Sequence, residues 1–203
     1  MSKKPSEGVE PEPLFDDLSQ VHSRTWELLS EAAVDRLSPM HTPVVATIAS
    51  DGSPRVRTVV LRKVDAAGRT LVFHTDTRSI KIEELRKDSR ISLHTYDAPR
   101  RTQIRIEGVA TIHTDDRFAQ VQWDASQPMS RECYRIPVAP GTPMPKPMTS
   151  EIWLAEGRIN FAAVVIEARV VEWLLLHHQQ HRRARFEYEP GEETFTKAEW
   201  LGP

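Results

Sequence analysis

The stretch RVRTVVLRKVDAAGRTLVFHTDTRSIK, residues 55–81, decides the fold because it contains two strand patterns and the start of a helix in immediate succession. Residues 55–64 and 70–75 are rich in β-branched and apolar side chains, and the sequence DAAGR between them is typical of a turn. Residues 79–87 then place Ile82 and Leu85 at helical spacing. This order predicts an antiparallel hairpin that leads into a short amphipathic helix.

The rest of the chain repeats the same pattern of short strands. Besides the helix at residues 79–87, helices are expected within residues 14–37 and 115–126, and the prolines of residues 135–148 predict a long surface loop. Gly108 interrupts one strand as a β-bulge does. Many short strands with few helices predict a mainly β (α+β) fold, an antiparallel barrel decorated by N-terminal and peripheral helices. The further strands are expected at residues 43–49, 90–96, 102–113, 160–176, 184–190 and 197–202.

Composition limits the classes of function. The chain has 203 residues, a formal net charge of −2 and one cysteine, Cys133. We expect residues 1–13, which are polar and contain prolines, to form a disordered tail, and residues 14–203 to form a single domain. The charge argues against nucleic acid as a partner, and no apolar run is long enough to span a membrane. A lone cysteine favours a reducing compartment, so the expected location is cytoplasmic.

The positive charges on the strand of residues 55–64 raise a question of orientation. Side chains alternate between the two faces of a strand, so Arg57 and Arg62 face opposite sides of an ideal one. In one interpretation, both arginines face solvent. In the other, the strand is bulged and both arginines reach one ligand. The pattern alone leaves both interpretations open.

The segment that follows favours an anionic ligand. Thr75, Thr77, Ser79 and Lys81 lie close together where a strand ends and a helix begins. The N-terminus of a helix has free backbone N–H groups and a positive dipole end, which suit a phosphate. The alternative interpretation is an ordinary helix cap formed by Thr77 or Ser79.

Three other groups of residues are less informative. His177 and His181 are four residues apart, which on a helix suits a metal, but they follow a strand pattern and precede another, so we expect a hairpin loop and no metal site. The run HRRAR is too short, and too poor in aromatic residues, to indicate nucleic-acid binding. Cys133 is interpreted as a packing residue.

The motifs together resemble the pyridoxamine 5'-phosphate oxidase family of FMN-binding split barrels, from about Val44 to the C-terminus. The resemblance rests on the order of RTVVLR (residues 57–62), His74-Thr75, SIK (residues 79–81), TQIRIEG with Gln103, Trp173, and Arg185-Phe186. It implies an antiparallel Greek-key split β-barrel and an FMN cofactor. It also implies a homodimer whose active sites lie across the subunit interface and accept a small-molecule substrate.

The resemblance also implies roles for individual residues. Those expected to hold the FMN phosphate and its surroundings are Arg57, Thr75, Ser79 and Lys81, and those expected near the flavin ring are Arg62 and Gln103. Trp173 and Arg185 are expected to reach the flavin from the partner subunit. Thr58, Val59 and His74 complete the predicted cofactor site, and His181 and Arg183 are the candidates for binding substrate.

This sequence also departs from the family pattern. Ile80 occupies the position of an arginine beside the phosphate lysine, and Arg78 is a candidate to replace that charge. Arg62 and His74 replace a lysine and a tyrosine, and the family's glutamine-serine pair has no clear match in residues 131–143. These differences favour an FMN-dependent oxidoreductase of the oxidase-like branch, with an unidentified substrate and electron acceptor. The alternatives are a true pyridoxamine or pyridoxine 5'-phosphate oxidase, a deazaflavin-dependent reductase, and a non-enzymatic FMN carrier or sensor.

Overall fold

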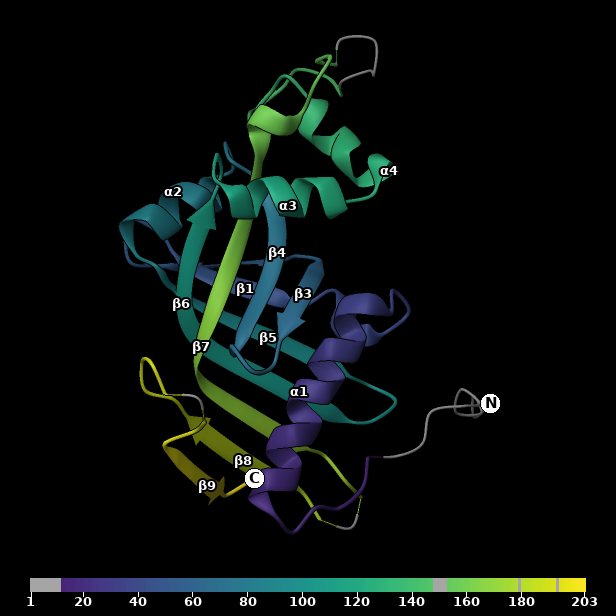
Figure 1. The fold of residues 1–203 in the computed structure, drawn as a ribbon, viewed down its shortest axis with the longest axis vertical. Coiled ribbons are helices and arrows are strands. Elements are labelled where there is room, and N and C mark those ends of the chain that lie inside the picture. Colours follow the sequence, from purple (N-terminus) through teal and green to yellow (C-terminus); the bar gives the residue numbers. More distant parts are fainter. Residues whose placement is uncertain (1–11, 148–152, 179, 193) are drawn as a thin grey trace.

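The computed structural model describes residues 12–147, 153–178, 180–192 and 194–203, and they form a split β-barrel (Figure 1). The predicted mainly β class is confirmed. All strand pairs are antiparallel, and the main path of the sheet has the order β2-β1-β5-β6-β7-β4-β3, with β8 and β9 continuing from β7. The strands are β1 (Val44–Ile48), β2 (Pro54–Thr58), β3 (Leu61–Asp65), β4 (Thr70–Asp76), β5 (Arg90–Asp97), β6 (Thr102–His113), β7 (Phe161–Leu175), β8 (Arg182–Glu187) and β9 (Lys197–Leu201).

Four α-helices in the described residues cover parts of this sheet: α1 (Leu18–Val34), α2 (Ile80–Lys87), α3 (Arg117–Ala125) and α4 (Pro128–Arg131). Short 3₁₀ turns lie at Pro39–His41, Glu132–Arg135 and Arg158–Asn160. The first helix is shorter than the helical pattern predicted because Asp17 caps it, its carboxylate accepting from the backbone N–H groups of Ser19 and Gln20. None of these helices has both the length and the apolar composition needed to cross a bilayer.

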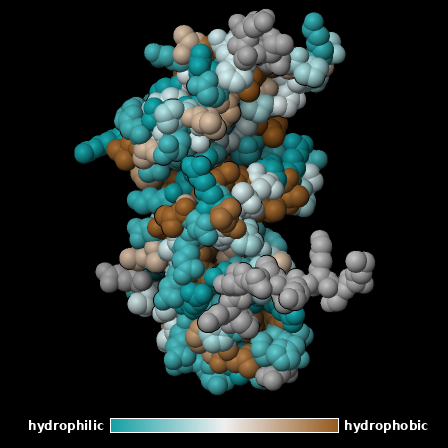
Figure 2. Space-filling model, turned by 90° about the vertical axis from the view of Figure 1, so that its right-hand side faces the viewer, coloured by the Kyte–Doolittle hydropathy of each residue, from teal (hydrophilic) through white to brown (hydrophobic). Residues whose placement is uncertain are grey.

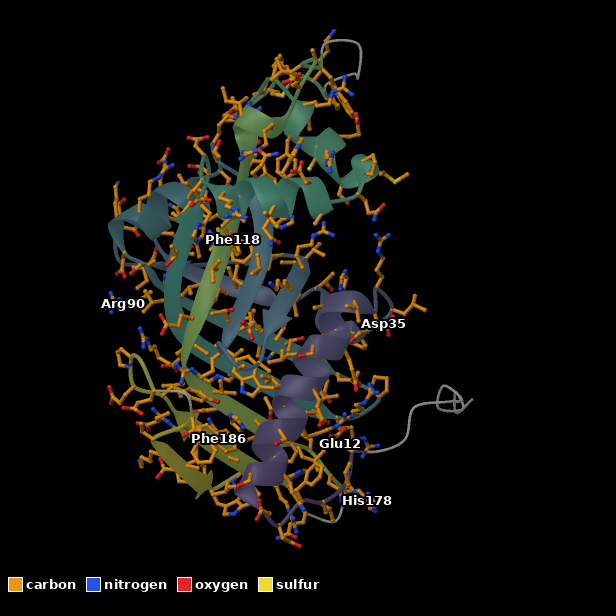
Figure 3. The ribbon with its side chains drawn as sticks, in the orientation of Figure 1. Glu12, Asp35, Arg90, Phe118, His178 and Phe186 are labelled. Atoms are coloured by element: carbon orange, nitrogen blue, oxygen red, sulfur yellow. The ribbon has the colours of Figure 1, made fainter. Side chains whose placement is uncertain are left out.

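The main hydrophobic core lies between α1 and the sheet. Val21, Leu29 and Ala32 on one face of α1 have no exposed surface, and they belong to the same buried cluster as Trp173 and Phe186. Figure 3 shows Phe186 on the part of the sheet that α1 crosses. On the face shown in Figure 2, hydrophobic residues form separate patches among hydrophilic ones, as is normal for a folded domain.

The continuous strand predicted over residues 55–64 is wrong. The structure divides it into β2 and β3, with Val59 and Val60 outside both strands. The division arises because β2 pairs with β1 and β3 pairs with β4, which lie toward opposite ends of the sheet path. Between β2 and β3, the backbone N–H of Val59 donates to the carbonyl of Pro43 at 2.9 Å. Arg57 and Arg62 are therefore on different strands, so the alternation of side chains along one strand does not decide whether they face the same side.

The predicted tail also extends too far. Glu12 is only 3% exposed and its carboxylate pairs with Arg24 of α1 at 2.7 Å; Figure 3 shows it beside that helix. This ion pair orders the chain at the end of the range expected to be disordered. Residues 1–11 lie outside the described residues.

The bulge predicted at Gly108 is present where β6 meets β7. The register shifts between Glu107 and Gly108, because β7 carries the additional residue Arg169 opposite them. A Cβ atom on Gly108 would lie 2.3 Å from the carbonyl oxygen of Glu167. The close approach of the two backbones therefore requires glycine here.

We expect Gly108→Ala to destabilise the protein, because the added methyl group collides with backbone that cannot move without breaking strand pairing. Overpacking of this kind costs about 1–3 kcal/mol, measured as the free energy of unfolding in urea. Gly202→Ala is the matched control, since a Cβ atom there meets nothing within 4 Å. Equal stability of the Gly108 variant and the parent would contradict the requirement for glycine.

Candidate functional site

A pocket of about 510 Å³ opens where β4 ends and α2 begins. We call it the β4–α2 pocket. It lies at the end of the molecule where Figure 1 shows α2, α3 and α4. One side is polar and comes from β4 and α2, and the other is a largely apolar wall from the segment after α4. The lining residues are His74, Thr75, Asp76, Ser79, Lys81, Cys133, Tyr134, Ile136, Val138, Ala139, Pro140, Gly141, Thr142 and Met144.

Three predicted residues meet on the polar side. The Lys81 ammonium donates to the hydroxyls of Thr75 at 2.9 Å and Ser79 at 3.2 Å. The two hydroxyl oxygens are 3.3 Å apart. Burial lowers the pKa of Lys81, the positive charge of Arg57 lowers it further, and the carboxylates of Asp76 and Glu84 oppose this shift. The cluster is therefore a partly desolvated cation beside two hydroxyls, a donor set suited to an anion.

Ser79 is the N-cap residue of α2, but its side chain makes no capping hydrogen bond. Its hydroxyl instead faces Lys81 and Thr75. The alternative interpretation of an ordinary serine cap is therefore wrong at this position. The Ser79 side chain therefore does not cap the first backbone N–H groups of α2, and these groups lie beside Lys81.

Arg57 lies behind this cluster and is already paired. Its guanidinium contacts Glu84 at 3.0 Å and also donates to the hydroxyl of Thr47. Burial acts to raise the pKa of the Glu84 carboxyl, but hydrogen bonds from Thr47 and Arg57 and the charges of Arg57 and Arg55 outweigh it, so the pKa is lowered. Arg57 thus adds less net charge to the pocket than the motif alone predicts.

Arg62 and His74 form a second pair beside the pocket. The Nε of Arg62 is buried and has no hydrogen-bond partner among the described residues. Burial lowers the pKa of His74 to about 4, the nearby charge of Arg62 lowers it further, and a 3.3 Å contact with Gln122 acts against the shift. His74 is therefore neutral at pH 7, and Arg62 keeps an unsatisfied donor.

Arg78 does not replace the cation missing at Ile80. Its guanidinium pairs with Asp76 at 2.7 Å and donates to the carbonyls of Ile136 at 2.9 Å and Pro137 at 3.1 Å. Ile80 itself is 50% exposed. Among the described residues, the charge of Arg78 is thus used to hold the pocket wall.

The remaining polar candidates lie on another part of the sheet. His113, at one end of β6, pairs with Ala163 of β7, and Ala163 pairs in turn with His74 of β4. Gln103 is at the other end of β6. At about 3.3 Å per residue, ten residues of strand place Gln103 roughly 30 Å from His74. Gln103, Arg183 and Arg185 lie on this distant part of the sheet, which we call the β6–β8 face.

Glu172 is the centre of the β6–β8 face. Its carboxylate contacts Arg183 at 2.5 Å, Arg105 at 3.4 Å and Arg185 at 3.9 Å. The side-chain oxygen of Gln103 accepts a 3.1 Å hydrogen bond from Nε2 of His94. One chain therefore does not bring these residues to the β4–α2 pocket.

The expected flavin contact of Trp173 is not available in this structure. Its side chain has no exposed surface and packs with Ala184 and Phe186 in the core under α1. Arg183 and Arg185 alternate with these residues along β8 and so point to the other face of the sheet. Trp173 and Arg185 therefore face opposite sides of the sheet in this chain.

The other predicted residues are placed as follows. Thr58 is exposed at the end of β2, and Val59 is buried at the crossing to β3. His181 is exposed in the loop between β7 and β8, so the expected hairpin is confirmed. Among the described residues, no group of three His, Cys, Asp or Glu side chains is arranged to hold a metal.

Sequence reasoning missed the pocket wall. Cys133, interpreted as a packing residue, is instead exposed and lines the pocket with the buried Tyr134. Ile136 and Val138–Thr142 complete this wall. The only signal in the sequence was the density of prolines, which indicated a loop but not where it folds.

Comparisons with known proteins agree with the predicted resemblance. Residues 23–114 match the family model described as pyridoxamine 5'-phosphate oxidase, FMN-binding domain. This range contains the polar side of the pocket and ends before the wall. The family resemblance predicted from the motifs is therefore confirmed.

Curated relatives match over part of their length. The pyridoxine/pyridoxamine 5'-phosphate oxidase of Vibrio vulnificus (strain YJ016) is 40% identical over 82 residues, covering 40% of this chain and 38% of the relative. That of Aeromonas hydrophila is 33% identical over 113 residues, covering 51% of this chain and 53% of the relative. The chain thus matches between two fifths and about half of the length of these enzymes.

Solved structures share the fold over nearly the whole chain. A pyridoxamine 5'-phosphate oxidase-related, FMN binding protein from Nostoc punctiforme has a TM-score of 0.67 at 22% identity, covering 91% of this chain and 95% of its own. PhzG from Burkholderia lata, solved with tetrahydrophenazine-1-carboxylic acid, has a TM-score of 0.69 at 20% identity, covering 95% and 99%. At these identities the likeness establishes the fold alone.

The low pKa of His74 makes stability depend on pH. Unfolding restores the pKa from about 4 to its ordinary value of 6.5, so the unfolded chain binds more protons between these values. This contribution to stability is complete above pH 6.5 and is lost as the pH falls toward 4, with a slope of at most about 1.4 kcal/mol per pH unit.

We expect His74→Gln to flatten this slope in urea unfolding measured from pH 7 to pH 4.5. The exposed His94, changed to Gln, is the matched control and should leave the slope as in the parent. An unchanged slope in the His74 variant would show that this residue is not held neutral by burial.

Proposed function

We propose that this protein is an FMN-binding oxidoreductase, with the FMN phosphate at Lys81, Thr75 and Ser79. The observation that carries the proposal is this cluster, at the start of α2 and inside a pocket of about 510 Å³. Supporting it, the residues that match an FMN-binding family model include all three. A phosphate dianion would gain the Lys81 charge, two hydroxyl donors and the positive end of α2.

The residues present fit such a ligand in three respects. The pocket volume lies within the range of about 300–1,000 Å³ typical of cofactor and ligand sites. Its polar side offers donors for a phosphate, and its wall offers apolar surface for less polar parts of the cofactor. The buried Nε of Arg62 is an unsatisfied donor beside the pocket, as expected for a group that completes its bonds on a ligand.

The proposed chemistry divides between cofactor and protein. Bound FMN would supply a two-electron acceptor for oxidation of the substrate. Lys81, Thr75 and Ser79 would hold the phosphate, while Arg62 would provide a positive charge near the ring. Neutral His74 can neither add a second charge nor give up a proton from its cationic form at pH 7. The wall segment would exclude water from one side of the site.

We further propose a homodimer with shared sites. Gln103, Arg183 and Arg185 lie toward the opposite end of β6, β7 and β8 from the pocket of their own chain, so they would serve the pocket of a second copy. The β6–β8 face and the neighbouring strands expose apolar side chains, among them Val56 at 68% and Tyr96 at 39%. A homodimer would cover such a surface.

The substrate is proposed to differ from pyridoxamine phosphate. Arg183, the candidate for holding a substrate phosphate, is already paired with the carboxylate group of the buried Glu172. His181 remains exposed in its loop. Arg62 has a planar guanidinium with donors in fixed directions, where the family pattern has the single ammonium of a lysine. Together these features favour a substrate other than pyridoxamine 5'-phosphate.

The first test concerns the phosphate. We expect Lys81→Ala to weaken FMN binding by about 1.5–3 kcal/mol, or roughly ten- to a hundredfold, because a charge-assisted contact is lost. Riboflavin, which lacks the phosphate, should bind both proteins alike. Titration followed by flavin fluorescence measures both ligands, and the visible spectrum of the purified protein separates FMN from a deazaflavin.

Lys87→Ala is the matched control for Lys81, since Lys87 is exposed at the other end of α2 and its ammonium donates to the hydroxyl of Ser50 at 3.0 Å. It should bind FMN as the parent does. If Lys81→Ala retains parental affinity for FMN, the phosphate lies elsewhere.

The second test concerns assembly. We expect size-exclusion chromatography with light scattering to give a dimer of about twice the chain mass of 23.2 kDa. Arg185→Ala should weaken FMN binding without loosening the β4–α2 pocket of its own chain. A stable monomer that binds FMN as tightly as the dimer would contradict the shared site.

The third test concerns the substrate. We expect anaerobic mixing of FMN-loaded protein with pyridoxamine 5'-phosphate to leave the flavin absorbance unreduced on the timescale of turnover, because small displacements of the reacting carbon cost about a hundredfold in rate. Rapid bleaching would instead identify a true pyridoxamine 5'-phosphate oxidase. Failure of every amine and alcohol tested to bleach the flavin would favour an FMN carrier or sensor.

A further inference from the structure

Among the described residues, the contacts that anchor the apolar wall of the β4–α2 pocket lie at its beginning. The side-chain amide of Asn160 donates to the carbonyl of Tyr134 at 2.8 Å, and the backbone N–H of Leu154 donates to the carbonyl of Arg135 at 2.7 Å. A Cβ on Gly157 would lie 2.9 Å from the Tyr134 backbone, so the two segments are in close contact here. These contacts hold residues 134–135 firmly.

The wall beyond Pro137 is much less constrained. Among the described residues, Val138–Pro147 makes one backbone hydrogen bond, from Thr142 to Ala139 at 3.2 Å, within its own turn. Yet Val138, Ala139, Pro140, Gly141, Thr142 and Met144 all line the pocket. Their position therefore depends on the last anchor before them.

That anchor is Arg78. Its Nη2 and Nη1 donate to the carbonyls of Ile136 and Pro137 at 2.9 and 3.1 Å, at the point where the wall leaves the core. The same guanidinium donates two parallel hydrogen bonds to the carboxylate of Asp76, from Nε to Oδ1 at 2.9 Å and from Nη2 to Oδ2 at 2.7 Å. Asp76 is 8% exposed and is itself part of the polar side. One side chain thus joins the polar side of the pocket to its wall.

This geometry requires an arginine. A planar guanidinium presents donors in fixed directions and can satisfy a carboxylate and two carbonyls at once, whereas a lysine ammonium is a single point of charge. The pairing with Asp76 also neutralises the charge, so Arg78 adds little attraction for a phosphate. Its contacts lead away from Lys81, toward the wall.

We propose that Arg78 is a positioning residue that holds the wall segment Ile136–Met144 over the β4–α2 pocket and so retains the flavin. The inference rests on the proposed function for the identity of the ligand, but the anchoring itself does not. A residue that positions the wall affects any flavin in the pocket. A residue that binds the phosphate affects FMN alone.

The test compares Arg78→Lys with Arg86→Lys, the latter changing an exposed arginine in the last turn of α2. For Arg78→Lys we expect the dissociation constants of FMN and riboflavin to rise together, on the order of tenfold, with their ratio unchanged. Lys81→Ala should change that ratio. Arg86→Lys should change neither constant. Parental affinity in Arg78→Lys, or a loss confined to FMN, would overturn the proposal.

A second measurement needs no ligand. Hydrogen exchange of the Thr142 amide, whose hydrogen bond to the carbonyl of Ala139 lies within the wall, should be faster in Arg78→Lys than in the parent, while the amides of β6 and β7 exchange alike. Unchanged exchange in the wall would overturn the anchoring. If the parent protein binds no flavin, the proposed function fails, yet this exchange result still decides the role of Arg78.

Asp76→Asn provides the second variant in case Arg78→Lys does not fold, as judged by circular dichroism. It removes the charge that fixes the guanidinium while keeping the shape of the side chain. Faster exchange of the wall is expected again, and protection equal to the parent would contradict the clamp.

Discussion

The length of β7 is the constraint on which the rest of the structure depends. Its first half pairs with β4 and its second half with β8, while β6 accompanies it along nearly its whole length. A single strand of 15 residues thus connects the region of the β4–α2 pocket at one end to the β6–β8 face at the other. The close backbone contact at Gly108 allows the two strands to remain paired through the bulge between those surfaces.

The charges around the β4–α2 pocket are largely used within the protein. Glu84 pairs with Arg55 and Arg57, and Asp76 pairs with Arg78. Because these carboxylates are almost fully buried, a cation close by offsets the cost of removing each of them from water. What remains available to an anionic ligand is Lys81 with its two hydroxyls, and the unsatisfied Nε of Arg62. Fewer positive charges are therefore available to an anionic ligand than a count of the basic residues around the pocket indicates.

Much of the fold and part of the site could be predicted from local patterns. Alternating apolar residues, turn sequences and the glycine of the bulge identify strands because these features act over a few residues. The cluster of Thr75, Ser79 and Lys81 was accessible for the same reason, since the strand end and the helix start that hold it are adjacent in sequence. The family resemblance then connected the cluster to FMN.

The sequence by itself determined the strand pattern, the helix start at Ser79 and the residue types of the phosphate cluster. Only the tertiary structure decided which partner each charge takes and which face each side chain occupies. The division of residues 55–64 follows from pairing with strands that are distant in sequence, and the burial of Trp173 follows from α1 packing over β8. Arg78 holds the wall because the segment around Ile136, far along the chain, folds back onto the end of β4. Such choices depend on contacts between remote segments, which no local pattern encodes.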